Sequence, residues 1–185
     1  MQVELKVNDK SVQAEIPEEQ LKETVLFEQL KKLGLIEDKP KTGYERVKKG
    51  EMYYVIDTEY NSMLKITEFN DKEDEQCYNT GNYYNDKIIA ENNARADRLL
   101  RQLRQWQAAN DKSISEKDWN DESKKKWFVA YSYGAEKLYA DYYYIMRLPN
   151  TIHFATKEKA EEAIEVFRDE LIWYFVEYQQ RLDEE

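Results

Sequence analysis

Carboxylates near the end of a predicted strand are the residues of this chain best suited to chemistry. Asp57 and Glu59 follow a short apolar run, and Glu158 occurs near the start of a later predicted helix. Carboxylates brought together from such positions could hold two metal ions for phosphodiester hydrolysis. The other usual reagents are scarce, because the 185 residues include one cysteine, Cys77, and one histidine, His153. A single cysteine cannot form an internal disulfide or a site with several thiolates.

A nuclease motif is only partly present. The run Val55-Ile56-Asp57-Thr58-Glu59 resembles the hydrophobic-D-x-E motif of DEDD-type exonucleases, and residues 153–160 resemble their H-x-A-x-x-D motif with Glu158 in place of Asp. The middle aspartate motif is not recognisable, and the interval is too short for a ribonuclease-H-like sheet. Glycine-rich phosphate-binding motifs and a G-x-S-x-G motif do not occur in the sequence. We therefore predict a protein that is not an enzyme, without catalytic residues, metal or cofactor, and keep a metal-dependent nuclease as the last alternative.

The composition favours a binding protein with an aromatic core. Acidic residues outnumber basic ones by 38 to 28, a formal net charge of −10, which disfavours free nucleic acid as the main ligand. Fifteen tyrosines, six phenylalanines and four tryptophans can bury enough surface for a core despite a charged content of 36%. The sequence contains no membrane-spanning apolar run and no secretory signal, so we expect a cytoplasmic protein without membrane contact.

Alternation of apolar residues predicts three hairpins, and helical spacing predicts a helix after each of them. The predicted fold is α+β: an N-terminal hairpin-helix module followed by two β-β-α units, with two long helices packed on small antiparallel sheets. The predicted elements are a hairpin at residues 3–16 with a helix from Pro17 to about Gly34, strands at 52–56 and 63–66 with a helix at 86–109, and strands at 127–131 and 138–146 with a helix at 157–182.

These elements suggest three parts of the chain. Residues 1–35 form a small N-terminal module, residues 36–50 are polar and form a linker, and residues 51–185 form an α+β domain. Within that domain, residues 51–109 and 127–182 are predicted to be an internal β-β-α repeat. The repeat rests on matched residues: Tyr84 with Phe154, Asp86 with Thr156 and Ala90 with Ala160 at an offset of 70, and Tyr53 with Trp127 at an offset of 74.

Two stretches carry the whole net charge. Residues 51–85 hold two basic and eight acidic groups, and residues 153–185 hold four and ten, so each contributes −6, while residues 86–109 contribute +2. In the second stretch, steps of four, three and four place four acidic residues on one helix face over roughly 16 Å. This spacing is on the scale of phosphates in nucleic acid, so the row is a candidate partner-binding site, with an ordinary solvated face as the alternative. The residues of this acidic row are Glu158, Glu162, Glu165 and Asp169.

Arginines and tyrosines supply the other candidate contacts. Arg95, Arg98, Arg101 and Arg104 recur every three residues and spread around the first long helix. Arg98 and Arg101 are candidates for partner binding, and pairing with acidic groups of the same chain is the alternative. Adjacent strand residues face opposite sides, so the cluster Tyr142-Tyr143-Tyr144 directs at least one ring outward unless both faces are covered. Tyr142 and Tyr144 are therefore candidates for an exposed interface, with burial in an aromatic core as the alternative.

Two segments resemble small acidic proteins encoded by phages and prophages of Gram-positive bacteria: Thr42 to Ile56, and Ile152 to Phe167 with its F-x-T-K-E-x-A-E-x-A core. The resemblance covers residues 42–60 and 125–180. It implies an inhibitor of a host defence nuclease in the host cytoplasm, such as a type II anti-CRISPR protein that binds Cas9 with its guide RNA. Acidic and aromatic surfaces would then mimic DNA. The alternative is a structural or regulatory interaction protein, including a homodimer through the apolar end of the last helix.

Overall fold

The computed structural model describes residues 2–7, 10–15, 41–60 and 62–183, and the chain divides into two units at Pro40. In the first unit, β1 (Gln2–Val7) pairs antiparallel with β2 (Lys10–Glu15), with Val7 opposite Lys10. This pairing confirms the N-terminal hairpin. The helix predicted from Pro17 lies outside the described residues.

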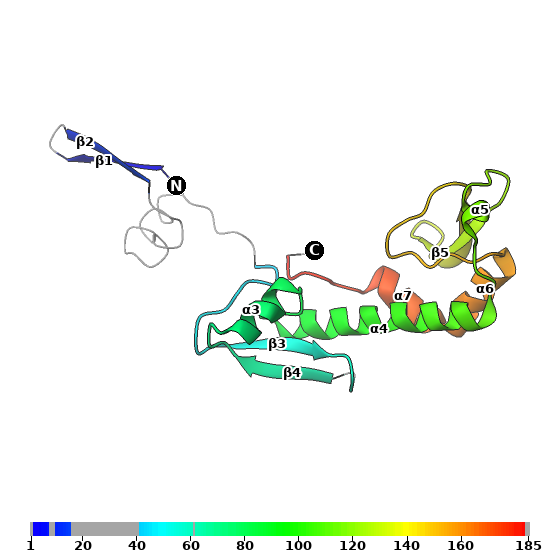
Figure 1. The fold of residues 1–185 in the computed structure, drawn as a ribbon, viewed down its shortest axis with the longest axis horizontal. Helices are drawn as coiled ribbons and strands as arrows, with labels where there is room; N and C mark the ends of the chain where they lie inside the picture. The colour runs from blue at the N-terminus through cyan, green and yellow to red at the C-terminus, as the bar shows by residue number, and fades with distance from the viewer. Residues whose placement is uncertain (1, 8–9, 16–40, 61, 184–185) are drawn as a thin grey trace. The chain divides into compact units, whose positions relative to one another are not determined.

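The second unit has two hairpins joined by a long helix, so the predicted α+β fold is confirmed (Figure 1). Both hairpins are antiparallel, and two short helices, α3 and α5, appear where the sequence predicted none. The elements are β3 (Met52–Asp57), β4 (Ser62–Thr67), α3 (Lys72–Asn79), α4 (Lys87–Asn110), α5 (Glu116–Trp119), β5 (Lys126–Ser132), β6 (Lys137–Tyr143), α6 (Lys157–Val166) and α7 (Arg168–Val176).

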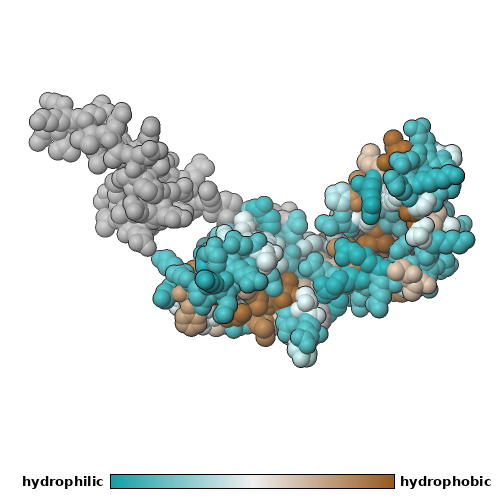
Figure 2. Space-filling view, viewed as in Figure 1, coloured by the Kyte–Doolittle hydropathy of each residue, from teal (hydrophilic) through white to brown (hydrophobic). Residues whose placement is uncertain are grey.

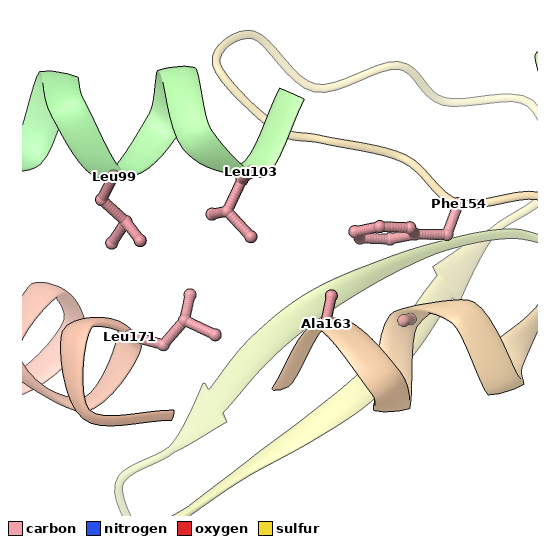
Figure 3. Packing of buried hydrophobic residues seen from close by; sticks show 6 residues of the cluster. Leu99, Leu103, Phe154, Ala163 and Leu171 are labelled. Atoms are coloured by element: carbon pink, nitrogen blue, oxygen red, sulfur yellow. The ribbon is translucent and has the colours of Figure 1, made fainter. Parts of the chain in front are cut away.

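Helix α4 links the two hairpins because its buried face is continuous along its length. Asp86 caps the helix, and its carboxylate accepts hydrogen bonds from the backbone amides of Ile88 and Ile89 at 2.8 and 3.0 Å. Ile89 packs beside β3, whereas Leu99 and Leu103 pack with residues of α6 and α7. In Figure 3, Leu99, Leu103, Leu171 and Phe154 point toward one another from α4, α7 and the segment before α6.

The two β-β-α units share a detailed geometry. In each, one residue ahead of the helix forms a single antiparallel bridge to the hairpin: Tyr84 to Tyr54, with N···O distances of 2.7 and 3.0 Å, and Phe154 to Trp127, with distances of 3.0 and 2.7 Å. The next helix is capped two residues later, and its fourth residue is a fully buried alanine. The matched pairs Tyr84–Phe154, Asp86–Thr156 and Ala90–Ala160 therefore occupy equivalent places, and Tyr54 rather than Tyr53 corresponds to Trp127.

Residues 41–50 are not the linker that the sequence predicted. Arg46 forms ion pairs with Glu68 at 3.2 Å and with Glu75 at 2.9 Å, and the amide of Val47 donates to the Tyr83 hydroxyl at 3.1 Å. The polar composition of this stretch misled the prediction, because its side chains bond to partners within the first β-β-α unit rather than to water. The remainder of the predicted linker lies outside the described residues.

The last predicted helix, residues 157–182, is bent into two, which corrects the sequence prediction. Phe167 leaves the helical region with φ −113° and ψ 19°, so α6 ends before it and α7 begins after it. The bend lets Ala160 and Ala163 lie on the sheet of β5 and β6 while Leu171 packs toward α4. A straight helix with this seam would follow only one of these surfaces.

The chain after α7 is not helical and lies against α4, although helix was predicted there. The Tyr178 hydroxyl donates to Oδ1 of Asn93 at 2.7 Å, and the Asn92 side chain donates to the Gln179 carbonyl at 3.0 Å. Further on, the Leu182 amide donates to the Thr42 carbonyl at 3.0 Å. These long-range bonds fix the tail to the first β-β-α unit.

Gly43 occupies a position that other residues cannot adopt without strain. Its φ is +94°, and a Cβ atom there would lie 3.0 Å from Cγ1 of Ile89. We expect Gly43→Ala to lower the free energy of unfolding by about 2–3 kcal/mol, from backbone strain plus overpacking. Gly81→Ala is the matched control, because Gly81 has φ +74° but open space around it, and should cost only about 1 kcal/mol. Equal losses in urea unfolding would show that the contact with Ile89 adds nothing.

Candidate functional site

The acidic row lies along an open groove between β6 and α6. This groove has a volume of about 550 Å³, and we call it the acidic groove. Three of the four predicted row residues, Glu158, Glu162 and Glu165, line it, whereas Asp169 belongs to α7 beyond the bend. Its lining residues are Lys137, Leu138, Tyr139, Ala140, Lys157, Glu158, Glu161, Glu162, Ile164, Glu165 and Arg168.

Part of the negative charge in the acidic groove is already compensated. Lys159 pairs with Glu162 at 2.6 Å, and Arg168 pairs with Glu165. Exposed pairs at this spacing contribute little and weaken with salt, so a stronger cationic partner can replace them. Glu158 forms no ion pair within 4 Å in the described part of residues 41–183. Hydrogen bonds from its own backbone amide and from the Thr156 side chain, together with the nearby charge of Lys157, lower its pKa.

Tyr142 and Tyr144 contact each other at the end of β6. Their ring centroids are 5.4 Å apart, and the ammonium of Lys125 lies 4.0 Å from the Tyr142 centroid. Tyr142 is half-buried against Trp127, whereas Tyr144 is exposed and belongs to an exposed run that begins at Tyr143 and continues through Ile145 and Met146. We call Tyr143, Tyr144, Ile145 and Met146 the aromatic rim.

The aromatic rim is held by a buried lysine that the sequence did not single out. Lys126 is 1% exposed, and its ammonium donates to the main-chain carbonyls of Asp121 and Lys124 at 2.9 Å and to that of Tyr144. Three carbonyl oxygens satisfy all three donors of the ammonium. This arrangement fixes the backbone from which the rim projects.

One arginine of α4 forms an ion pair within the chain, and the other three form none in the described residues. Arg95 binds Glu170 through two hydrogen bonds of 2.9 and 3.0 Å, and its guanidinium lies 4.0 Å from the Trp173 ring centroid. The internal-pairing alternative therefore holds for Arg95. In the described part of residues 41–183, Arg98, Arg101 and Arg104 form no ion pair within 4 Å, although Arg98 adds to the effect of Arg95 in lowering the pKa of Glu170. Arg98 is half-buried beside Met63 in a small depression.

Asp57 and His153, which the sequence analysis considered for chemistry, have structural contacts. The Asp57 carboxylate accepts the backbone amides of Glu59 and Tyr60 at 2.9 and 3.4 Å, which is a turn-stabilising arrangement. His153 is buried between Trp119 and Phe128, and desolvation lowers its pKa. Among the described residues, no group of three or more His, Cys, Asp or Glu side chains is placed to hold a metal ion.

A comparison with known protein families, with curated protein sequences and with solved structures found no match to this chain. No helix in the described part of the chain is long and apolar enough to cross a membrane. Hydrophilic residues cover most of the visible face of residues 41–183, with smaller hydrophobic areas between them (Figure 2).

An apolar cavity beside β5 was missed by the sequence analysis. It has a volume of about 440 Å³ and lies between α4, β5, α7 and the loop of residues 148–152. Leucines and aromatics at helical spacing predict a core equally well, so periodicity alone could not reveal an unfilled space. Its walls include Leu99, Leu103, Tyr131, Ile152, Leu171 and Phe175.

Proposed function

We propose that this protein is a non-enzymatic inhibitor that binds a host defence nuclease, with guide-loaded Cas9 as the first partner to test. The acidic groove carries the proposal, because it gathers Glu158, Glu162 and Glu165 along one open depression. A nuclease must present Lys and Arg to its nucleic acid, and these side chains are the complement of such a groove. The resemblance to small acidic phage proteins supports the choice of Cas9.

The binding mechanism follows from the surfaces around this groove. A basic segment of the nuclease would exchange its nucleic-acid phosphates for the glutamates of α6, while the aromatic rim would supply apolar contact area. Charge complementarity mainly accelerates association, and buried aromatic anchors supply most of the affinity. Inhibition then needs no reaction by the protein itself.

The test of this proposal is a double charge reversal in the acidic groove. We expect Glu158→Lys with Glu165→Lys to slow association with guide-loaded Cas9 by about tenfold at low salt, with a smaller effect at high salt. Surface plasmon resonance at two salt concentrations measures this rate, and circular dichroism checks the fold. Glu59→Lys with Glu122→Lys is the control, because both residues are exposed and the change in net charge is the same. Equal slowing in both variants would remove the acidic groove from the mechanism.

A further inference from the structure

The edge of β5 that faces away from β6 is paired at only one residue. Trp127 exchanges two main-chain hydrogen bonds with Phe154, so its N–H and C=O point away from β6. Main-chain groups alternate in direction along an antiparallel strand, so those of Val129 and Tyr131 point to the same edge. Within residues 41–183, no main-chain pairing continues this edge beyond Trp127.

The first β-β-α unit closes the equivalent edge with a side chain. Ile56 lies two residues after Tyr54, as Val129 lies two residues after Trp127. The side-chain oxygen of Asn82 accepts the Ile56 N–H at 2.7 Å, and its side-chain nitrogen donates to the Ile56 carbonyl at 3.0 Å. This amide therefore forms the two bonds that a neighbouring strand would supply.

The second unit cannot close its edge in this way. Asn82 stands two residues before Tyr84, and the residue two before Phe154 is Ile152. An isoleucine side chain has no donor or acceptor, so the N–H and C=O of Val129 lack the partner that Ile56 has. The internal repeat thus differs at a position where the difference leaves the N–H and C=O of Val129 unpaired, among the described residues, beside Ile152.

The apolar cavity lies directly beside this open edge. Val129 and Tyr131 line it from β5, Leu99 and Leu103 from α4, and Leu171 from α7. A residue added opposite Val129 would direct its side chain to the same face as Val129, toward these helices. Free main-chain groups next to a side-chain pocket are the two elements that a strand-addition site needs.

Positive charge marks one end of the cavity. Arg104 and Arg147 line an adjoining depression that shares the loop residues 148–151 with the cavity. Neither arginine has a carboxylate partner within residues 41–183; Arg147 lies over the Trp119 ring at 5.3 Å. An incoming segment with an acidic residue beside its apolar one would complement this charge.

We propose that this edge of β5 binds an extended segment of a partner protein as an added strand, which takes the place of Ile152 opposite Val129. The segment would carry a large apolar side chain, seated in the cavity opposite Val129, and a flanking acidic residue near Arg104 and Arg147. This site is separate from the acidic groove, which borders β6, so the inference does not depend on the proposed nuclease inhibition.

The test uses the full chain and a fluorescein-labelled pentapeptide, Asp-Val-Phe-Val-Asp, blocked at both ends. We expect fluorescence anisotropy to detect binding, and amide NMR shifts to place it at Val129 and Tyr131. Ile152→Asn should weaken binding by at least about tenfold, because the new amide can close the edge as Asn82 does. Ile152→Leu is the matched control and should retain binding.

Peptide variants keep the proposal testable even if Ile152→Asn is poorly folded. Methylation of the phenylalanine nitrogen removes the donor to Val129 and should weaken binding by about tenfold, and a Lys-flanked peptide should bind more weakly than the Asp-flanked one. Equal binding of the methylated and unmethylated peptides would show that the cavity takes an apolar group without strand addition. Absence of binding at millimolar peptide would also overturn the proposal.

Discussion

Phe154→Ala is expected to lower the free energy of unfolding by about 3–5 kcal/mol, the usual cost of truncating a buried phenylalanine. Phe154 is fully buried, its ring lies edge-on to Trp106 at 6.1 Å between centroids, and Leu99, Leu103 and Leu171 pack in the same cluster (Figure 3). The cavity already present beside this cluster means that truncation would enlarge an existing space. Urea unfolding followed by tryptophan fluorescence measures the loss.

Phe69→Ala is the control for Phe154→Ala. Phe69 is 59% exposed, so the same truncation should change the free energy of unfolding by no more than about 0.5 kcal/mol. Similar losses for the two variants would mean that the Phe154 cluster contributes no more than surface packing. A lower urea midpoint with an unchanged m-value for Phe154→Ala would support the expected loss.

The second large effect is expected from Asp74→Ala, at about 3 kcal/mol at pH 7. One oxygen of the buried Asp74 carboxylate accepts the Tyr53 hydroxyl at 2.7 Å, and the other accepts the amides of Phe69 at 2.7 Å and Asp71 at 3.2 Å. Truncation leaves these donors without their acceptor inside the protein, and each unsatisfied buried donor is costly. Glu73→Ala is the matched control, because Glu73 is the exposed preceding residue of the same helix.

Asp74 also makes the free energy of unfolding depend on pH. Burial by itself raises the pKa of the carboxyl, but the hydrogen bonds from Tyr53, Phe69 and Asp71 lower it to about 2, from 3.8. Because the folded pKa is the lower one, the stabilisation is complete above about pH 4 and is lost as the pH falls toward 2. We expect the difference in unfolding free energy between wild type and Asp74→Ala to shrink over that interval. A constant difference from pH 7 to pH 2 would contradict the assigned hydrogen bonds.

The hairpins and helix α4 could be predicted because their signals are local. Alternation in β3 and β5 places one set of side chains on each face, and Asp86 has the residue type and position of a helix cap. The repeat could also be detected, since Ala90 and Ala160 must both be small to lie against a sheet. The bend at Phe167 has no such signal, because two packing surfaces rather than a breaker residue set it.

For the candidate sites, residue spacing was informative only within one element. Steps of four and three placed Glu158, Glu162 and Glu165 together, and they share the acidic groove. The ion pair between Arg95 and Glu170 could not be predicted, because the two residues are 75 positions apart in the chain.

The amino-acid sequence by itself determined the α+β class, the two β-β-α units and the acidic face of α6, because periodicity, capping and charge spacing act over a few residues. Only the tertiary structure decided that residues 41–50 pack on the first unit, that Arg95 is internally paired, and that β5 keeps an open edge. Asn82 and Ile152 show the physical reason. Whether a side chain closes a strand edge depends on which main-chain groups the fold brings beside it, and those groups come from distant parts of the chain.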